Sequence, residues 1–194
     1  MADERWLIAG LGNPGKKYAA NRHNTGFMVA DLLAERMGTG FKRDRSGAQL
    51  ATGRLAGLPV LLVKPTTFVN GSGGTLASAC AFYKIAPSRL VVVYDELDLP
   101  FGTIRLKFGG GDNGHNGARS VTAALGTRDY YRVRVGIGRP PGRMDPAYFV
   151  LTDFSAAERK EIPLVIERAA DAVQALLSNG LAAAQNQFHT AAPA

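Results

Sequence analysis

The segment Leu7–Phe27, which reads LIAGLGNPGKKYAANRHNTGF, decides the fold. It begins as a short apolar run typical of a buried strand, breaks at Gly10–Gly15, and ends with Arg22-His23-Asn24 before a predicted helix. Glycine and proline favour turns, and glycine lets a backbone come close to a ligand. Asn13 and His23 are therefore predicted to lie on loops that a rigid sheet supports, where catalytic side chains often occur.

Strands and helices alternate along the rest of the chain. The apolar patterns predict strands at residues 6–11, 48–55, 58–64, 90–94, 103–108 and 132–138. They predict helices at residues 27–37, 75–85 and 118–125, and from Ala156 onward, with an interruption or restart at Pro163 and a last piece to about Phe188. Ser155 and Glu158 form a capping box before the C-terminal helices. We therefore expect a single α/β domain over residues 1–194, a three-layer sandwich in which helices cover both faces of a mostly parallel mixed sheet.

Composition narrows the classes of function. The chain has 194 residues, a net charge of +7 and one cysteine, Cys80, which cannot form an internal disulfide and suits a reducing compartment. A basic protein favours polyanionic partners such as nucleic acid, although a soluble protein that is merely basic fits the charge equally well. No apolar run is long enough to cross a membrane, and the first residues, MADERW, lack the features of a signal peptide. We therefore expect a cytoplasmic protein.

The run Gly10–Gly15 matches the dinucleotide-binding pattern G-x-G-x-x-G. That pattern requires a helix that starts within the loop and an acidic residue about twenty residues further on. No apolar periodicity follows before Phe27, and no acidic residue closes a second strand at that distance. The sequence thus disfavours a nicotinamide or flavin site, and we expect no cofactor.

The usual metal ligands and covalent nucleophiles are poorly placed. The histidines, His23, His115 and His189, show no metal-ligand spacing. The acidic run at residues 95–98 could hold magnesium, but a solvated turn at the end of a strand explains it more simply. Ser72 misses the nucleophile-elbow pattern, and Cys80 falls within an apolar helix stripe. These observations favour a hydrolytic base that acts without a metal or a nucleophile of its own.

A histidine can activate water near neutral pH, and a carboxylate partner fixes its tautomer and raises its basicity. Asp95 follows the predicted central strand, at the end where α/β sheets bind ligands, so we expect it to be the partner of His23. Three glycine-rich loops, which begin at Gly10, Pro65 and Gly109, are called the first, second and third loop. Each supplies one asparagine: Asn13, Asn70 and Asn116. Their amides suit an ester carbonyl, an oxyanion or a peptide N–H, although each alone could simply stabilise its own turn.

Basic residues alternate along two predicted strands. Arg105 and Lys107 share one strand face, and Arg132 and Arg134 share another. A half-exposed sheet face has the same pattern, which is the simpler interpretation. Together with the positive net charge, a phosphate clamp is a second interpretation.

These residues together resemble the bacterial peptidyl-tRNA hydrolase family. The motifs occur in the family's order and spacing from about Leu7 to His189: GLGNPGKKY, RHNTGF, KPTTFVNGSG, YDELDLPFG, GGGDNGHNG, RVRVGIGRPPG and NQFH. The resemblance implies a monomeric, metal-independent esterase of ribosome rescue. Such an enzyme cuts the ester between a peptide and the 3′-terminal adenosine of tRNA, which releases free tRNA and peptide.

The resemblance also implies roles for single residues. His23 would activate water, Asp95 would hold His23 in its basic form, and Asn13 would distinguish a blocked amino group from a free one. Contacts with the tRNA 3′ CCA end and the peptide would come from Tyr18, Phe68, Asn70 and Asn116, and contacts with the 5′ phosphate at the acceptor stem from Arg105 and Arg134. The sequence departs from the commonest family pattern at Val69, Tyr94, Arg105 and Asp112-Asn113. These departures concern peptide contact and phosphate geometry rather than the expected base.

Two alternatives stay open from the sequence. A relative of this family could bind RNA without hydrolysing it, and the intact set Asn13, His23 and Asp95 argues against that function. A nucleotide-cofactor enzyme is the other alternative, which the absorbance of a bound cofactor would reveal.

Overall fold

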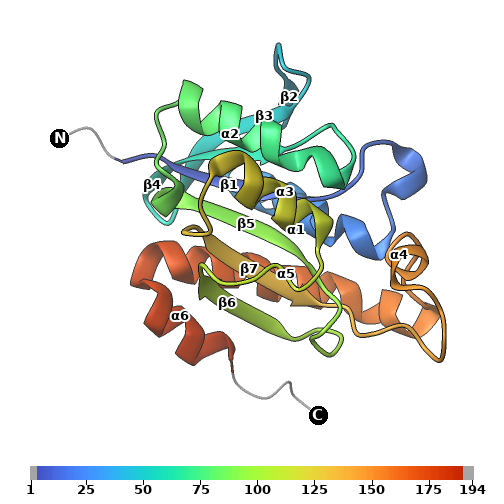
Figure 1. The fold of residues 1–194 in the computed structure, drawn as a ribbon. Helices are drawn as coiled ribbons and strands as arrows, with labels where there is room; N and C mark the ends of the chain where they lie inside the picture. Colours follow the sequence, from blue (N-terminus) through green and yellow to red (C-terminus); the bar gives the residue numbers. More distant parts are fainter. Residues whose placement is uncertain (1–3, 190–194) are drawn as a thin grey trace.

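A seven-stranded mixed sheet forms the middle layer of the protein (Figure 1). The computed structural model describes residues 4–189, so the two ends of the expected 1–194 domain lie outside the described residues. In spatial order the strands are β2 (Lys42–Arg43), β3 (Gln49–Leu55), β4 (Leu58–Lys64), β1 (Trp6–Gly10), β5 (Leu90–Glu96), β7 (Tyr131–Gly136) and β6 (Ile104–Phe108).

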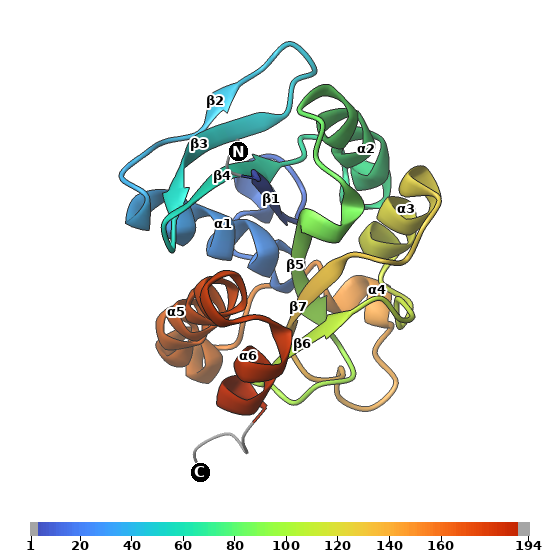
Figure 2. The ribbon, with the colours of Figure 1, turned by 90° about the vertical axis from the view of Figure 1, so that its left-hand side faces the viewer.

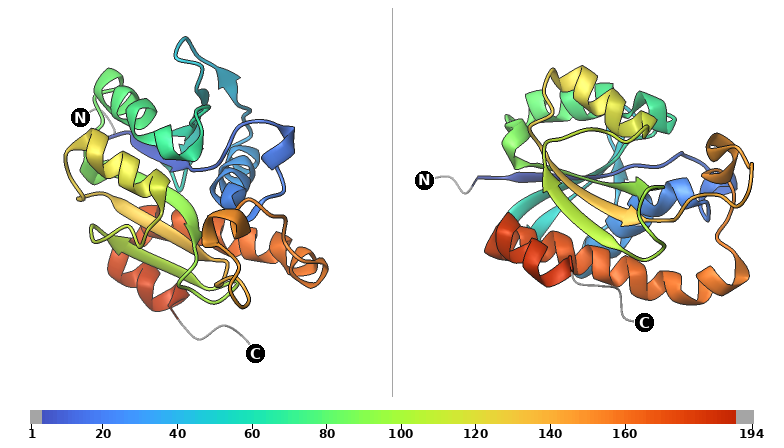
Figure 3. Two further views of the ribbon diagram at one scale, coloured as in Figure 1. Left: turned by 45° about the vertical axis from the view of Figure 1, so that its right-hand side comes forward. Right: turned by 60° about the horizontal axis from the view of Figure 1, so that its bottom comes forward.

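Helices cover both faces of this sheet (Figure 2). Helices α2 (Ser72–Phe82) and α3 (Asn116–Leu125) pack on one face. Helices α1 (Thr25–Arg36), α5 (Ala156–Asn179) and α6 (Leu181–Phe188) pack on the other, where α5 and α6 lie together (Figure 3). The short helix α4 (Pro146–Phe149) lies beside the end of β5. The predicted three-layer α/β sandwich is confirmed.

Strand periodicity divides the interior into two cores. On β1 the side chains of Leu7 and Ala9 face α2 and α3, whereas Ile8 faces α1 and α5. On β5 the same alternation sends Val92 to the first core and Val91 to the second. Because both faces are covered, the central strands are continuously apolar rather than alternating with polar residues.

Five of the seven strands run in the same direction, as expected for a mostly parallel mixed sheet, and β3 and β6 run against them. In the described residues, β4–β1, β1–β5 and β5–β7 are parallel, whereas β2–β3, β3–β4 and β7–β6 are antiparallel. The turn at Ala56-Gly57, where both residues have positive φ, closes a hairpin between β3 and β4. Residues 97–103 are too few for a crossover, so β6 runs back against the direction of β5.

Two helix predictions need correction. Helix α5 is continuous through Pro163, because its buried stripe, which includes Ala169 and Val173, packs on the sheet while the proline is exposed. Helix α2 begins at Ser72, inside the segment predicted to be a glycine-rich loop. A Cβ on Gly73 would lie 2.0 Å from the carbonyl oxygen of Ser120, so glycine there lets α2 pack closely on α3.

Two glycines, Gly10 at the end of β1 and Gly26 near the start of α1, let backbone pack directly against backbone. A Cβ on Gly10 would lie 2.1 Å from the carbonyl oxygen of Gly26 at the start of α1. A Cβ on Gly26 would lie 2.3 Å from the carbonyl oxygen of Val93 on β5. The first loop is thus pressed between α1 and the sheet, which explains part of the dinucleotide-like pattern without a nucleotide.

The edge strand β6 is covered by the end of α6. Gln185 Nε2 donates to the Leu106 carbonyl at 3.1 Å, and His189 Nε2 accepts from the Leu106 N–H at 2.8 Å. These contacts occupy backbone groups that an edge strand otherwise leaves unpaired. Among residues 4–189, no helix combines the length and apolar character that a membrane span requires.

Candidate active site

Two histidines share one buried carboxylate at the end of β5. His23, on the short turn Arg22–Asn24, places its Nδ1 2.8 Å from Asp95 Oδ2. His115, on the residue before α3, places its Nε2 3.0 Å from Asp95 Oδ1. Asp95 is only 2% exposed and both imidazoles are buried. The contact between His23 and Asp95 that the sequence predicted is therefore present, and His115 joins it.

The hydrogen bonds determine the tautomer of each imidazole. The backbone N–H of Ala118 donates to His115 Nδ1 at 3.1 Å, so this nitrogen is an acceptor and the hydrogen lies on Nε2, where it is donated to Asp95. Asp95 can only accept, so His23 donates its Nδ1–H to it. The Nε2 atom of His23 is then left with a free lone pair, the form that a general base requires.

The ionisation of this group follows from its burial and charges. Burial alone would lower the pKa of His23, but the negative charge of Asp95 and its hydrogen bond outweigh burial, so the pKa is raised. Burial alone would raise the pKa of Asp95, but the charges of His23 and His115 and their hydrogen bonds lower it well below its usual range. Asp95 is thus a carboxylate at every pH at which His23 titrates.

Contacts distant in sequence hold His23 in place. Its backbone N–H donates to the carbonyl oxygen of Val150 at 2.8 Å. The neighbouring Arg22 side chain pairs with Glu158 at 2.8 Å and lies 4.1 Å above the ring of Phe149. The turn that carries His23 is therefore anchored to the segment between α4 and α5.

A cavity of about 290 Å³ opens in front of these histidines. His23, Asp95, His115 and Asn116 contribute to its lining, with residues 145–147 at the start of α4 on the opposite side. Asn116 is exposed and also lines a shallow groove with Asn70 and Arg119. A substrate can therefore extend from the cavity along α3 toward the second loop.

Asn13 occupies a supporting position. Its backbone N–H donates to Asn24 Oδ1 at 2.8 Å, and Asn24 Nδ2 donates back to the Asn13 carbonyl at 3.0 Å. Its side-chain Oδ1 accepts from the N–H of Val69 at 2.7 Å. Asn13 thus joins the first loop, the turn of His23 and the second loop, and it borders a separate pocket rather than the cavity.

The two aromatic residues that the sequence singled out contact each other. The rings of Tyr18 and Phe68 meet edge to face, with centroids 6.0 Å apart. Phe68 is 58% exposed, so its ring is accessible to a ligand. These rings come from the first and second loops, as Asn13 and Val69 do.

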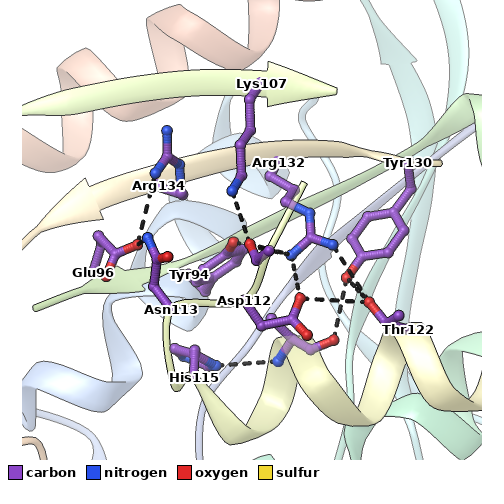
Figure 4. Close-up of polar contacts among 12 residues, drawn as sticks. Tyr94, Glu96, Lys107, Asp112, Asn113, His115, Thr122, Tyr130, Arg132 and Arg134 are labelled. Atoms are coloured by element: carbon purple, nitrogen blue, oxygen red, sulfur yellow. Dashed lines mark hydrogen bonds and ion pairs between the residues drawn. The ribbon is translucent and has the colours of Figure 1, made fainter. Parts of the chain in front are cut away.

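Four basic residues of β6 and β7 lie on one face of the sheet. The half-buried Arg105, Lys107 and Arg134 form a basic surface there, whereas Arg132 is buried (Figure 4 shows Lys107, Arg132 and Arg134). In the antiparallel register Arg105 is opposite Arg134 and Lys107 is opposite Arg132, so the two faces considered separately in the sequence are one face. Burial lowers the pKa of Lys107, and the charges of Arg134 and Arg132 lower it further. Glu96 partly neutralises this surface through a contact of 3.7 Å with Arg134. Such crowded cations suit a phosphate ligand.

Three side chains in the described residues have the geometry to hold a metal ion. Ligand atoms of His23, Asp95 and His115 all lie within 4.8 Å of one another. Spacing along the chain did not reveal this cluster, because His115 reaches His23 only through the fold. A metal would first have to displace the protons on His23 Nδ1 and His115 Nε2.

Sequence reasoning missed several residues of this site. It considered His115 only as a metal ligand and Arg132 only as part of a basic strand face, and it assigned no role in the site to Arg22 or Asn24. His115 caps α3, which begins at Asn116, but the predicted helix began only at Ala118, so the sequence did not reveal this capping position. The buried Arg132 had no signal, because an alternating basic strand normally faces solvent.

Comparisons with known proteins agree with the geometry. A family model described as peptidyl-tRNA hydrolase matches residues 7–194. The chain is 64% identical to a peptidyl-tRNA hydrolase of Frankia casuarinae over 96% of this chain and 95% of the relative, and 59% identical to one of Mycobacterium marinum over 96% and 98%. A crystal structure of peptidyl-tRNA hydrolase from Acinetobacter baumannii superposes with a TM-score of 0.91 at 36% identity, covering 97% of this chain and 96% of that chain.

Proposed function

The chain belongs to the peptidyl-tRNA hydrolase family and hydrolyses peptidyl-tRNA, and we propose that His23 is the general base that activates the attacking water. The observation that carries this proposal is the 2.8 Å contact between His23 Nδ1 and Asp95 Oδ2 at the wall of the cavity. It leaves Nε2 as the basic nitrogen.

The reaction is a direct hydrolysis of the ester. His23 Nε2 takes a proton from water while the water oxygen bonds to the ester carbon. The tetrahedral intermediate then collapses, the bond from carbon to the 3′ oxygen of the terminal adenosine breaks, and the proton on His23 passes to that oxygen. Asp95 stabilises the imidazolium between these steps, and the products are a peptide with a free carboxylate and a free tRNA.

Amide groups orient the substrate in this proposal. Asn116 lines the cavity and supplies a donor for the ester carbonyl or the developing oxyanion. Asn13 distinguishes a blocked amino group from a free one. Its Oδ1 accepts from the Val69 N–H and has a second lone pair that can accept from a peptide N–H of the substrate. A free amino group is a charged ammonium, which is solvated differently from a neutral peptide N–H. Tyr18, Phe68 and Asn70 contact the CCA end and the peptide along the groove that Asn116 shares.

The 5′ phosphate of the tRNA binds the basic surface of β6 and β7. Arg105 and Arg134, opposite each other in register, are its proposed ligands, and Lys107 on the same face adds a third cation. We place the protein in the cytoplasm as a monomer whose single domain spans residues 1–194. Every group in the proposed step is a side chain, water or the substrate.

The replacement His23→Ala tests the base directly. We expect it to remove nearly all cleavage of an N-acetylated aminoacyl-tRNA, because general-base catalysis contributes about 10²–10⁴ in rate. Binding of uncharged tRNA should stay near its original strength, since His23 does not belong to the basic surface. Near-normal turnover by a folded His23→Ala protein would show that another group is the base. Asp171→Asn, which removes the partner of Arg36 at the other end of α1, is the control for preparation and folding.

A further inference from the structure

The loop between β6 and α3 has no regular structure to fix its shape. Residues Gly109, Gly110, Asn113 and Gly114 all have positive φ, and Asn113 is not a glycine. Such a backbone is not rigid by itself, because glycine gains the most conformational freedom when it is released. Yet this loop must deliver His115 to Asp95 with hydrogen-bond precision. Side-chain contacts therefore have to define its position.

The strongest of these contacts is a buried ion pair. Arg132 on β7 is 0% exposed, and its NH1 lies 2.6 Å from Asp112 Oδ1. The same guanidinium reaches the Tyr94 hydroxyl and Thr122 Oγ1 at 3.4 Å, and it lies 4.3 Å above the ring of Tyr130 (Figure 4). Arg132 is enclosed by the sheet, α3 and the loop, whereas the Asp112 side chain is 15% exposed, so Asp112 is held in position from the protein interior.

Asp112 is connected to His115 by one backbone turn. The carbonyl oxygen of Asp112 accepts from the N–H of His115 at 2.9 Å. Beside it, Asn113 Nδ2 donates to Glu96 Oε1 at 2.8 Å, and Glu96 follows Asp95 on β5. Moving Asp112 would therefore move the His115 imidazole relative to Asp95.

We infer that the Arg132–Asp112 ion pair is a positioning element of the hydrolytic reaction, which holds the 109–116 loop so that His115 and Asn116 stay aligned with Asp95 and the cavity. Neither Arg132 nor Asp112 lines the cavity, so both act through the loop. This inference rests on the proposed function of the His23–Asp95 site. It assigns Asp112 to turnover rather than to the binding of tRNA, which in the proposed function depends on the neighbouring, partly exposed Arg105, Lys107 and Arg134.

The test compares isosteric and charge-conserving changes at Asp112. Asp112→Asn should lower kcat by about 10- to 100-fold, the usual cost of misplacing a catalytic group by roughly 1 Å, while KM for peptidyl-tRNA changes little. Asp112→Glu keeps the charge beside Arg132 and should recover most of the lost turnover. Asp171→Asn removes an equivalent carboxylate from an ion pair with Arg36 on α1 and should leave kcat unchanged. An Asp112→Asn protein with unchanged kcat would overturn the inference.

A second variant separates positioning from stability. Asp112→Asn leaves a buried guanidinium without a counter-charge, so part of its effect is expected to be lost stability. The apolar pair Arg132→Met with Asp112→Leu removes both charges and should regain thermal stability, as buried ion pairs replaced by apolar residues often do. We expect kcat to stay low in this double variant because the ion pair that positions the loop is absent. Full recovery of kcat would show that the pair serves stability alone and would overturn the inference.

His23→Ala, measured beside these variants, distinguishes a failure of the proposed base from a failure of the proposed role of the ion pair. Turnover by His23→Ala would refute the proposed base whatever Asp112 does. An inactive His23→Ala protein together with a fully active Asp112→Asn protein would refute only the role of the ion pair.

Discussion

The replacement Asp95→Asn makes a sharp test of the hydrogen-bond chain at the active site. Asparagine is nearly isosteric with aspartate, but it offers one acceptor oxygen and one donor NH₂ instead of two acceptors. The Ala118 N–H fixes His115 with its hydrogen on Nε2, so the oxygen of the new amide will turn toward His115. The NH₂ then faces His23 Nδ1, which must become an acceptor. His23 is driven into the wrong tautomer, with its hydrogen on Nε2.

The size of this effect follows from the contacts. Changing the aspartate of a catalytic triad to asparagine costs about 10⁴ in kcat, or about 5.5 kcal/mol in activation free energy. We therefore expect Asp95→Asn to lose about 10³–10⁴ in single-turnover cleavage of N-acetylated aminoacyl-tRNA. The opposite amide orientation would set two buried donors against each other at His115, which costs about 1–3 kcal/mol. That difference keeps the productive orientation at a population of roughly one in 5 to one in 150, so the tautomer accounts for about 5- to 150-fold of the loss. The missing carboxylate charge, which would stabilise the imidazolium, accounts for the rest.

A second change should restore part of the activity. His115→Asn can still cap α3 by accepting from the Ala118 N–H, but it is too short to donate to residue 95. The amide of Asp95→Asn is then free to turn its oxygen toward His23. We expect the double variant to be about 5- to 150-fold more active than Asp95→Asn alone, although His115→Asn by itself lowers activity. A double variant no more active than Asp95→Asn would refute the tautomer argument.

Three further predictions follow from the same geometry. Because the pKa of His23 is raised and the base must be unprotonated, kcat/KM should increase with pH through a midpoint above the ordinary histidine value of about 6.5, and a midpoint below it in a pH–rate profile would contradict the electrostatic assignment. Arg134→Ala should lower the slope of log Kd against log salt for tRNA by about one unit, and an unchanged slope would place the phosphate elsewhere. Gly26→Ala puts a Cβ 2.3 Å from the carbonyl oxygen of Val93 and should destabilise the protein by at least about 1–3 kcal/mol in denaturant unfolding, whereas unchanged stability would mean that α1 shifts freely.

The Asp95 carboxylate bonds two imidazoles that differ in their surroundings. In the proposed mechanism His23, which lines the cavity, carries the mobile proton, whereas His115 is held at the start of α3 and supplies a fixed donor. A carboxylate bonded only to His23 would be free to rotate and to offer either oxygen. With His115 on one oxygen, the other is directed at His23 Nδ1. This geometry supports the proposal of a base with a fixed orientation.

The sequence by itself determined the parts that depend on short-range patterns. Apolar periodicity located the strands and helices, and the capping box Ser155–Glu158 marked the start of α5 as observed. The motifs identified the family, and the place of Asp95 at the end of the central strand made it the expected partner of His23. Local rules failed where packing outweighs propensity, as at Pro163 within α5 and at Gly73 within α2.

Only the tertiary structure decided which distant residues meet. The third loop brings His115 to Asp95, the segment after α4 anchors Arg22, and the antiparallel register of β6 and β7 merges two basic faces into one. Arg132 could not be recognised as buried, because its alternating strand predicts a solvent-facing side chain and only the overlying loop and α3 cover it. The physical reason is that periodicity records the local backbone, whereas burial and pairing depend on the closure of the whole chain around its two cores.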